Sequence, residues 1–285
     1  MSEFVKVGER ILAKPNGCDY DLLVGKAYTL KMDSWNNTSF LTEVSDMNIP
    51  EKVYYDNRDK FFLKRVLDSF NADDNNTTGV LLAGLKGSGK TLTAKMLAQN
   101  SNLPVIIVDN RYDERYLGDF FNKINTPVCI LFDEIDKGFH TERLLQFLDG
   151  IQDTTKKLVV FTCNKWDEDS IDSNLIDRCS RIKYFKEFTG MSDDLIDAIV
   201  TDNLKDDPRI DEVKNIIKTK FDVKSFDNIL SFVQEVNKYK DETVDTIVGD
   251  LNITFIDNSE DDDSIEIKAK SPIPVTISKD VEYDE

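Results

Sequence analysis

The sequence predicts an α/β fold in which helices sandwich a parallel sheet, with an all-helical lid after the sheet and small β-rich appendages at both ends. Residues 84–91 read GLKGSGKT and directly follow the apolar run 80–83, which is typical of a strand that ends in a glycine-rich loop. From there to residue 185, short apolar runs alternate with helical patterns, which predicts a parallel sheet covered by helices. After Gly190 the pattern is helical throughout, which predicts the lid.

Residues 84–91 fit the pattern G-x-x-x-x-G-K-[ST] of a phosphate-binding loop, or P-loop. Glycines let successive backbone N–H groups curl around a polyphosphate, the ammonium of Lys90 reaches the outer phosphates, and the hydroxyl of Thr91 is placed to ligate Mg²⁺. The predicted binding residues are Gly84, Leu85, Lys86, Gly87, Ser88, Gly89, Lys90, Thr91 and Leu92. An ordinary glycine-rich turn is the alternative, but the strand before the loop and the helix after it favour a nucleoside triphosphate ligand.

The elements around the P-loop follow from hydrophobic periodicity. Strands are predicted at residues 80–83, 104–108, 128–132, 158–162 and 181–185, and helices at 57–70, 192–203, 210–221 and 225–240. We therefore expect an α/β nucleotide-binding base over residues 56–188 and a helical lid over 189–245.

The two ends of the chain read as β-rich appendages. Before the base, residues 1–55 predict a small module of short strands, and a strand extension of the main sheet is an equally open interpretation. Its predicted strands lie at 8–13, 21–30 and 39–44, with turns at 15–17 and 36–37. After the lid, residues 246–285 form an acidic appendage with predicted strands at 252–256, 264–268 and 274–277.

The composition excludes several classes of function. A formal net charge of −18 argues against a surface that grips nucleic acid broadly, although a local basic pore stays open. His140 is the only histidine, which excludes Ser-His-Asp, Cys-His and multi-histidine metal chemistry. The four cysteines are scattered, which indicates reduced thiols rather than disulfides or a zinc site.

The sequence also shows no pattern typical of a signal peptide or a membrane span. The N-terminus lacks the basic-then-apolar order of a signal peptide, and no apolar stretch approaches the roughly 20 residues needed to cross a bilayer. We therefore expect a cytoplasmic protein with no membrane partner. Its richness in Asn, Asp and Lys favours a phage or low-GC bacterial source.

Two acidic residues follow the apolar run of residues 129–132. Asp133 is placed to hold the Mg²⁺ shell, and Glu134 can polarise a water for in-line attack on a γ-phosphate. Asn164 follows the next predicted strand, where an amide can orient that water and sense the phosphate. Charged pairs commonly just end strands, so these roles depend on the P-loop lying in the same sheet.

A GTPase is an alternative, because residues 164–167 spell N-K-x-D, the guanine-reading motif of GTPases. GTPases carry D-x-x-G at the metal-binding strand. Residues 133–136 read DEID, which lacks that glycine and supplies the in-line glutamate that GTPases lack. The sequence therefore favours ATP.

Three segments together resemble the second region of homology of AAA+ ATPases, T-x-N…L-D-x-x-L…R. They are residues 170–181, Thr162-x-Asn164 and the LLQFLDG segment at 144–150. The similarity extends from about residue 59 to residue 240. It is greatest to the classical AAA clade, including the mitochondrial Rieske-protein translocases, and clamp-loader subunits share the Arg-Cys pair. The resemblance implies an ATPase that uses ATP and Mg²⁺.

The resemblance also implies that an arginine acts in the nucleotide site of a neighbouring subunit. Arg178 is the expected finger, and Arg181 is a second candidate whose alternative role is a strand-end ion pair. A finger can raise the rate by about 10³ to 10⁵, because it neutralises charge that develops in the transition state. A finger supplied in trans requires a homo-oligomer, for which we expect six subunits.

Tyr116 and Leu117, with the glycine after them, match the pore loop by which such enzymes grip polypeptide. The segment from there to Asp133 is short for an unfoldase, so Tyr116 as an aromatic packed within a helix is the alternative. The lid helix has no sensor arginine at residues 225–230, which favours the classical clade over clamp loaders.

Three classes of function follow. The first is an ATP-driven machine that remodels, unfolds or disassembles a protein client, favoured by the negative charge and by Tyr116. The second is a replication loader or helicase, favoured by the resemblance at Arg178. The third is a scaffold whose assembly is controlled by the nucleotide.

Overall fold

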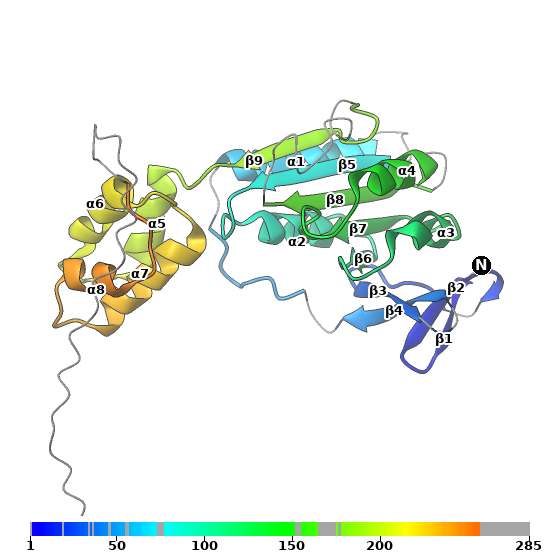
Figure 1. Cartoon of the computed structure of the whole chain (residues 1–285), viewed down its shortest axis with the longest axis horizontal. Coiled ribbons are helices and arrows are strands. Elements are labelled where there is room, and N and C mark those ends of the chain that lie inside the picture. The colour runs from blue at the N-terminus through cyan, green and yellow to red at the C-terminus, as the bar shows by residue number, and fades with distance from the viewer. Residues whose placement is uncertain are drawn as a thin grey trace, which may run out of the picture.

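The computed structural model describes residues 2–18, 20–33, 35, 37–44, 47–54, 57–72, 77–151, 155–164, 175 and 178–256. Within these ranges a sheet of nine strands runs through the base, and a bundle of helices follows it (Figure 1). The strands are β1 Ser2–Val7, β2 Arg10–Cys18, β3 Ala27–Asp33, β4 Thr38–Val44, β5 Thr77–Gly84, β6 Val105–Val108, β7 Val128–Phe132, β8 Lys157–Cys163 and β9 Tyr184–Phe188. Their order in the sheet is β1-β2-β4-β3-β6-β7-β8-β5-β9.

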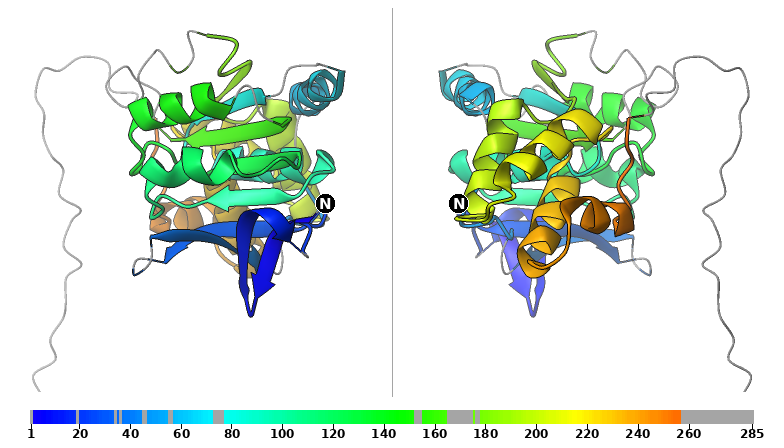
Figure 2. Two further views of the ribbon diagram at one scale, coloured as in Figure 1. Left: turned by 90° about the vertical axis from the view of Figure 1, so that its right-hand side faces the viewer. Right: turned by 90° about the vertical axis from the view of Figure 1, so that its left-hand side faces the viewer.

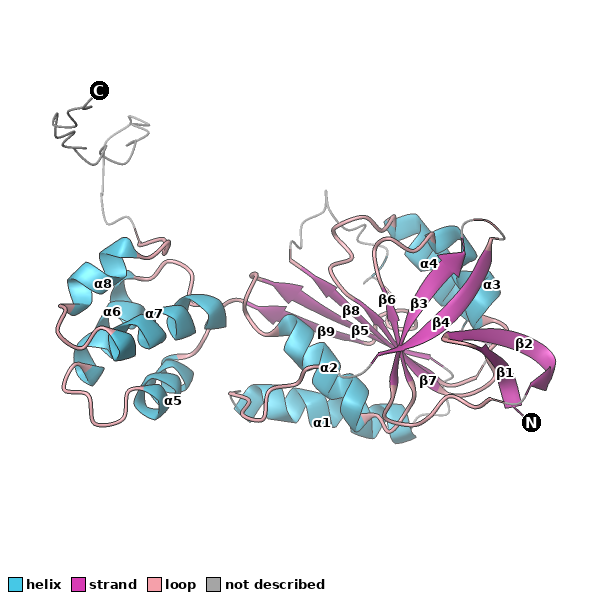
Figure 3. Ribbon diagram, turned by 90° about the horizontal axis from the view of Figure 1, so that it is seen from below, coloured by secondary structure: helices cyan, strands magenta, loops and turns pink. Residues whose placement is uncertain are grey.

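The described residues form eight α-helices, of which the first four cover the two faces of this sheet. They are α1 Asn57–Ala72, α2 Lys90–Asn100, α3 Leu117–Phe121, α4 Thr141–Ile151, α5 Asp193–Asn203, α6 Ile210–Lys220, α7 Phe226–Lys238 and α8 Val244–Asp250, with a short 3-10 helix, η1, at Glu114–Tyr116. Helices α1 and α2 lie on one face, and α3 and α4 on the other (Figure 3). Along β5, Leu81 packs into the α3/α4 core and Leu82 into the α1/α2 core, because successive strand residues point to opposite faces. The predicted fold class is confirmed.

The N-terminal strands extend the central sheet. Residues 27–30 of β3 pair in parallel with residues 105–108 of β6, and β4 pairs with β3 in the antiparallel direction. Strands β2 and β1 continue the sheet as an antiparallel hairpin that projects beyond the base (Figure 2). Of the two interpretations open from the sequence, the structure has the strand extension.

Two local predictions were wrong. Residues 15–17, predicted as a turn, lie within β2, where the register between Phe4↔Ala13 and Ser2↔Cys18 shifts and so accommodates the extra residues. The last strand begins at Tyr184 and not at Arg181, because residues 178–182 form a turn in which the N–H groups of Arg181 and Ile182 both donate to the carbonyl of Arg178.

Helices α5 to α8 share their own apolar core, which includes Ile199, Ile217 and Phe232. Helix α8 was not predicted and crosses the boundary expected at residue 245. The predicted strand at 252–256 is a single antiparallel bridge, Phe221 to Phe255. The predicted strands at 264–268 and 274–277 lie outside the described residues. No helix in the described part of the chain is long and apolar enough to span a membrane.

Candidate nucleotide-binding site

The parallel sheet gathers three loops at the carboxyl ends of adjacent strands. Strand β8 lies between β5 and β7. The P-loop follows β5, Asp133 and Glu134 follow β7, and Asn164 follows β8. Ligands of open α/β sheets bind at this edge, so the strand order brings the predicted site residues into one place.

The P-loop has a backbone that its glycines make possible. Gly84, Gly87 and Gly89 have φ values of 127°, 73° and 98°, in the region that residues with a Cβ atom seldom enter. A Cβ atom on Gly84 would also lie 2.2 Å from the carbonyl oxygen of Phe188 on β9. The loop therefore packs closely against the neighbouring strand and leads into α2, whose N-cap is Gly89.

Lys90 and Ser88 turn polar groups toward the inside of this loop. The Lys90 ammonium donates to the carbonyl oxygens of Gly84 at 2.8 Å and Leu85 at 2.6 Å, and its residue is only 5% exposed. Burial lowers its pKa, which the nearby acidic groups partly oppose. The Ser88 hydroxyl is buried and has no hydrogen-bond partner among the described residues. These donors suit the oxygens of a polyphosphate.

Thr91 and Asp133 bring together the oxygen atoms that Mg²⁺ prefers. The Thr91 hydroxyl donates to Asp133 Oδ1 at 3.0 Å, and the Thr162 hydroxyl lies 2.6 Å from the same oxygen. Thr162, on β8, was not assigned a site role from the sequence beyond its place in the T-x-N pattern. Thr91 and Asp133 would hold the metal ion, and Thr162 fixes the orientation of the carboxylate.

Glu134 occupies an unusual backbone conformation, with φ of 53°. Its N–H donates to the Thr162 hydroxyl at 2.8 Å. Its Oε1 accepts from Lys137 Nζ at 2.7 Å and from Asn164 Nδ2 at 2.9 Å, and these two donors, Lys137 first, hold the pKa of the carboxyl below its usual value. Sequence reasoning missed Lys137, because a lysine three residues after the acidic pair has no motif of its own.

Residues of the base, of the segment before α1 and of the lid line a cavity of about 470 Å³ over the P-loop. Its lining includes the polar residues Lys90, Thr91, Glu134 and Asn164 and the apolar residues Val53, Leu92 and Leu230. The lid contacts the loop directly, because the N–H of Phe226 donates to the carbonyl of Gly87 at 2.8 Å. The cavity thus combines polar groups that suit phosphates with apolar groups that suit a base. Residues 50–54 carry no motif, so the sequence did not indicate their place here.

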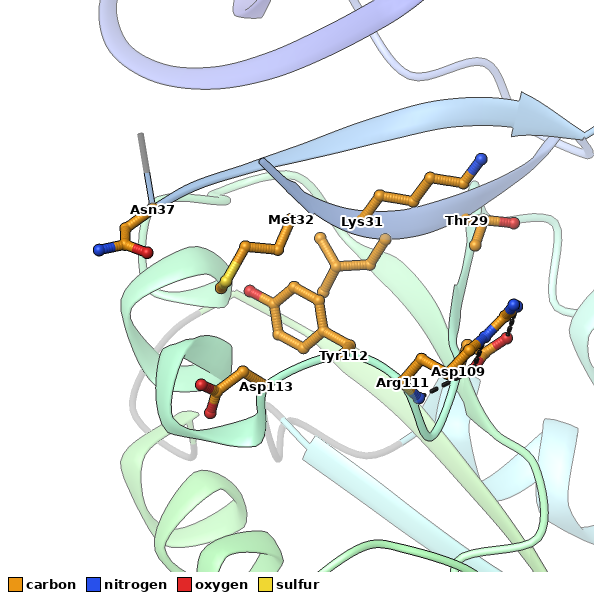
Figure 4. A pocket seen from close by; sticks show the side chains of 9 residues that line it. Thr29, Lys31, Met32, Asn37, Asp109, Arg111, Tyr112 and Asp113 are labelled. Carbon is orange, nitrogen blue, oxygen red and sulfur yellow. Dashed lines mark hydrogen bonds and ion pairs between the residues drawn. The ribbon is translucent and has the colours of Figure 1, made fainter. Parts of the chain in front are cut away.

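A second, larger hollow of about 570 Å³ lies between β3 and the segment that follows β6 (Figure 4). Three of its ionic residues form ion pairs: Arg111 binds the Asp109 carboxylate, and Asp113 binds Arg115, which lies outside the lining. The Tyr112 hydroxyl lies 2.6 Å from that of Ser39. Chemistry rather than size therefore assigns the nucleotide to the cavity over the P-loop.

The two candidate arginines differ in their surroundings. Arg181 is buried and binds the Asp149 carboxylate of α4 through two contacts of 2.8 and 2.6 Å, which lower the pKa of Asp149. This is the ion-pair role given as its alternative. Arg178 is exposed. Of the guanine-reading pattern, only Asn164 is described, and it contacts Glu134; residues 165–167 lie outside the described residues.

Tyr116 and Leu117 lie where η1 meets α3. Leu117 is fully buried, and Tyr116 is half-buried against the same core. The geometry is that of the packed aromatic, the alternative to a gripping loop, because η1 and α3 continue without an intervening loop.

Comparisons with known proteins agree with this site. Residues 80–187 match the family model described as "ATPase family associated with various cellular activities (AAA)". The chain is 35% identical over 121 residues to "ATPase family gene 2 protein" of Saccharomyces cerevisiae, covering 34% of this chain and 15% of that protein. It is 32% identical over 124 residues to "Probable 26S proteasome regulatory subunit 6B" of Caenorhabditis elegans, covering 34% of this chain and 30% of that protein.

A solved structure shares the fold. A chain from "Structural Basis for Katanin Self-Assembly" superposes with a TM-score of 0.50 at 18% identity, over 70% of this chain and 74% of that one. The present chain spans less than a third of the length of the two curated relatives.

The fold and the site define a P-loop nucleotide-binding protein. Residues 80–187 match the AAA ATPase family, for which ATP with Mg²⁺ is the usual cofactor.

Proposed function

We propose that this protein hydrolyses ATP and, as a homo-oligomer of six subunits, uses the energy to remodel, unfold or disassemble a protein client. Our assignment of hydrolysis rests on one observation: the Asn164 amide donates a hydrogen bond of 2.9 Å to the Glu134 carboxylate, beside the hydrogen-bonded pair Thr91 and Asp133. This contact supports Glu134 as a proton acceptor and Asn164 as its hydrogen-bond donor beside the phosphate cradle.

Each of these residues has a distinct task. Lys90 and the loop N–H groups bind the phosphates, and Thr91 and Asp133 hold Mg²⁺, which, when bound, neutralises negative charge on the phosphate oxygens. Glu134 accepts a proton from the attacking water, and Asn164 keeps its carboxylate oriented. Arg178, exposed on the surface, is the cation that we assign to a neighbouring subunit's site.

A protein client is supported by charge and by the relatives. The net charge of −18 opposes binding to nucleic acid phosphates. One relative is named as a proteasome regulatory subunit, and the similar solved structure concerns self-assembly.

The test measures ATP hydrolysis alone, with an unfolded protein, and with single-stranded DNA. We expect hydrolysis in the wild type, stimulation by unfolded protein, and none by DNA. Glu134→Gln should keep ATP binding and lose turnover by about 10² to 10⁴, whereas Glu187→Gln, an exposed glutamate on β9, should leave it unchanged. Equal turnover in Glu134→Gln would remove this residue from its role, and stimulation by DNA would favour the loader class.

A further inference from the structure

Residues 47–54 form a strap that leads from β4 to α1 and reaches three parts of the molecule. Ile49 packs against the α1/α2 core of the base. Val53 lines the nucleotide cavity. Tyr54 also lines that cavity and packs against the core of the lid. The strap therefore touches the base, the cavity and the lid within a few residues.

Polar contacts tie the strap to α5 of the lid. The Tyr54 hydroxyl donates to the Asp202 carboxylate and accepts from Asn203 Nδ2 at 3.2 Å. The Lys52 ammonium binds the same carboxylate oxygen of Asp202 and lies 5.1 Å from the centre of the Tyr54 ring. Two strap residues thus converge on one lid carboxylate, and they lower its pKa.

The position of Asp202 is unfavourable for the helix that carries it. Helix α5 ends at Asn203, so the carboxylate lies in the last turn, where the helix dipole disfavours negative charge. The last turn holds no basic residue. Lys52 and Tyr54 of the strap are the largest causes of the lowered pKa of Asp202, and Lys205, just beyond the helix, adds to them. The strap contact therefore stabilises this carboxylate.

We propose that Asp202 is a positioning residue that closes the lid over the nucleotide by holding the strap, through Tyr54 and Lys52, against α5. The apolar lining of the cavity comes from the strap, from Leu92 on α2 and from Leu230 on the lid. The Phe226 N–H joins the lid to the P-loop at Gly87, and the contacts of Asp202 join the lid to the strap. The proposal rests on the nucleotide binding in the proposed function, because it assigns a lock to that same cavity.

The test measures the affinity for Mg²⁺-ADP by calorimetry and the KM and kcat for ATP. Asp202→Asn and Tyr54→Phe should each weaken ADP binding and raise KM by about threefold to tenfold, with kcat within about twofold of the wild type. The double variant should lose little more ADP affinity than either single variant, because both changes act on the same contact between Tyr54 and Asp202. Asp206→Asn is the matched control: it removes the same charge four residues away, and its φ of 62° suits asparagine.

Charge reversal separates the lock from a merely structural effect. Lys52 is well exposed, with 60% of its side chain accessible, so Lys52→Glu should fold; it should weaken ADP binding, and Lys52→Glu with Asp202→Lys should restore it. Unchanged affinity in Asp202→Asn, an equal loss in Asp206→Asn, or no restoration in the reversed pair would overturn the proposal. A wild type that binds no ADP would instead overturn the proposed function.

Discussion

The Thr91 hydroxyl donates a hydrogen bond of 3.0 Å to the carboxylate of Asp133, a residue 42 positions later in the chain. Thr91 is the second residue of α2, the helix after β5, and Asp133 follows β7; β8 separates these two strands in the sheet. The contact shows that the P-loop and the acidic pair lie side by side.

Lys90→Ala should strongly weaken nucleotide binding. The buried ammonium is already held inside the loop by two carbonyl oxygens, so it is pre-oriented toward the phosphates. We expect a loss of ADP affinity of about 100-fold, typical of a charge-assisted contact made in a buried site. Calorimetry checks this, with Lys95→Ala on the same helix as the control. An affinity within twofold of the wild type would exclude Lys90 as the phosphate ligand.

Gly84→Ala should destabilise the protein by more than about 2 kcal/mol, because the new Cβ atom would clash with the Phe188 carbonyl at a φ of 127°. Gly150→Ala is the matched control: a Cβ atom there meets nothing within 4 Å, and Gly150 lies within α4. That change should stabilise by about 0.5–1 kcal/mol. Urea unfolding measures both, and equal stability of the two variants would contradict the close packing of the P-loop against β9.

Lys137→Ala should move the acid limb of the pH profile of kcat/KM to higher pH. Lys137 is the largest cause of the lowered pKa of Glu134. Without the lysine, the carboxyl takes up its proton at a higher pH and loses its function as a base sooner as the solution is acidified. Lys123→Ala, which is exposed and remote from Glu134, should leave the limb in place. A limb that does not move would show that Glu134 does not govern it.

Arg181→Ala should lower the free energy of unfolding by about 1–3 kcal/mol at neutral pH, because it leaves Asp149 without its two donors. Since the pair lowers the pKa of Asp149 from 3.8, its stabilisation is present above that value and is lost as the pH falls through the lower folded-state pKa. The difference between the wild type and the variant should therefore shrink in acid. Arg178→Ala, at an exposed position, should unfold like the wild type.

Arg178→Ala should reduce ATP turnover while leaving ADP binding intact, by about 10³-fold or more if the arginine acts in the transition state. Mixing this variant with Lys90→Ala subunits should restore part of the activity, since an intact P-loop in one subunit would meet an intact arginine in the other. Activity that mixing fails to restore would place Arg178 outside a shared site.

The predicted site residues lie together in the structure, whereas the segments that surround them had no signal in the sequence. Lys90, Thr91, Asp133 and Asn164 follow short apolar strands, and such strand ends are visible in local sequence. The strap at 47–54 has neither a motif nor a periodic pattern, and its contact with Asp202 joins segments about 150 positions apart. The turn expected at residues 15–17 lies instead inside β2, in the register shift between the pairs Phe4↔Ala13 and Ser2↔Cys18, which local sequence does not show.

The sequence by itself determined which residues we predict to bind phosphate and metal, because a P-loop and strand-end carboxylates depend on local spacing and residue type. Only the tertiary structure decided the strand order that puts β8 between β5 and β7, the burial of Leu117, and the ion pair that holds Arg181. These features depend on which segments, distant in the sequence, pack together. That packing is set by the total apolar surface that many side chains bury, which cannot be read from any short stretch of sequence.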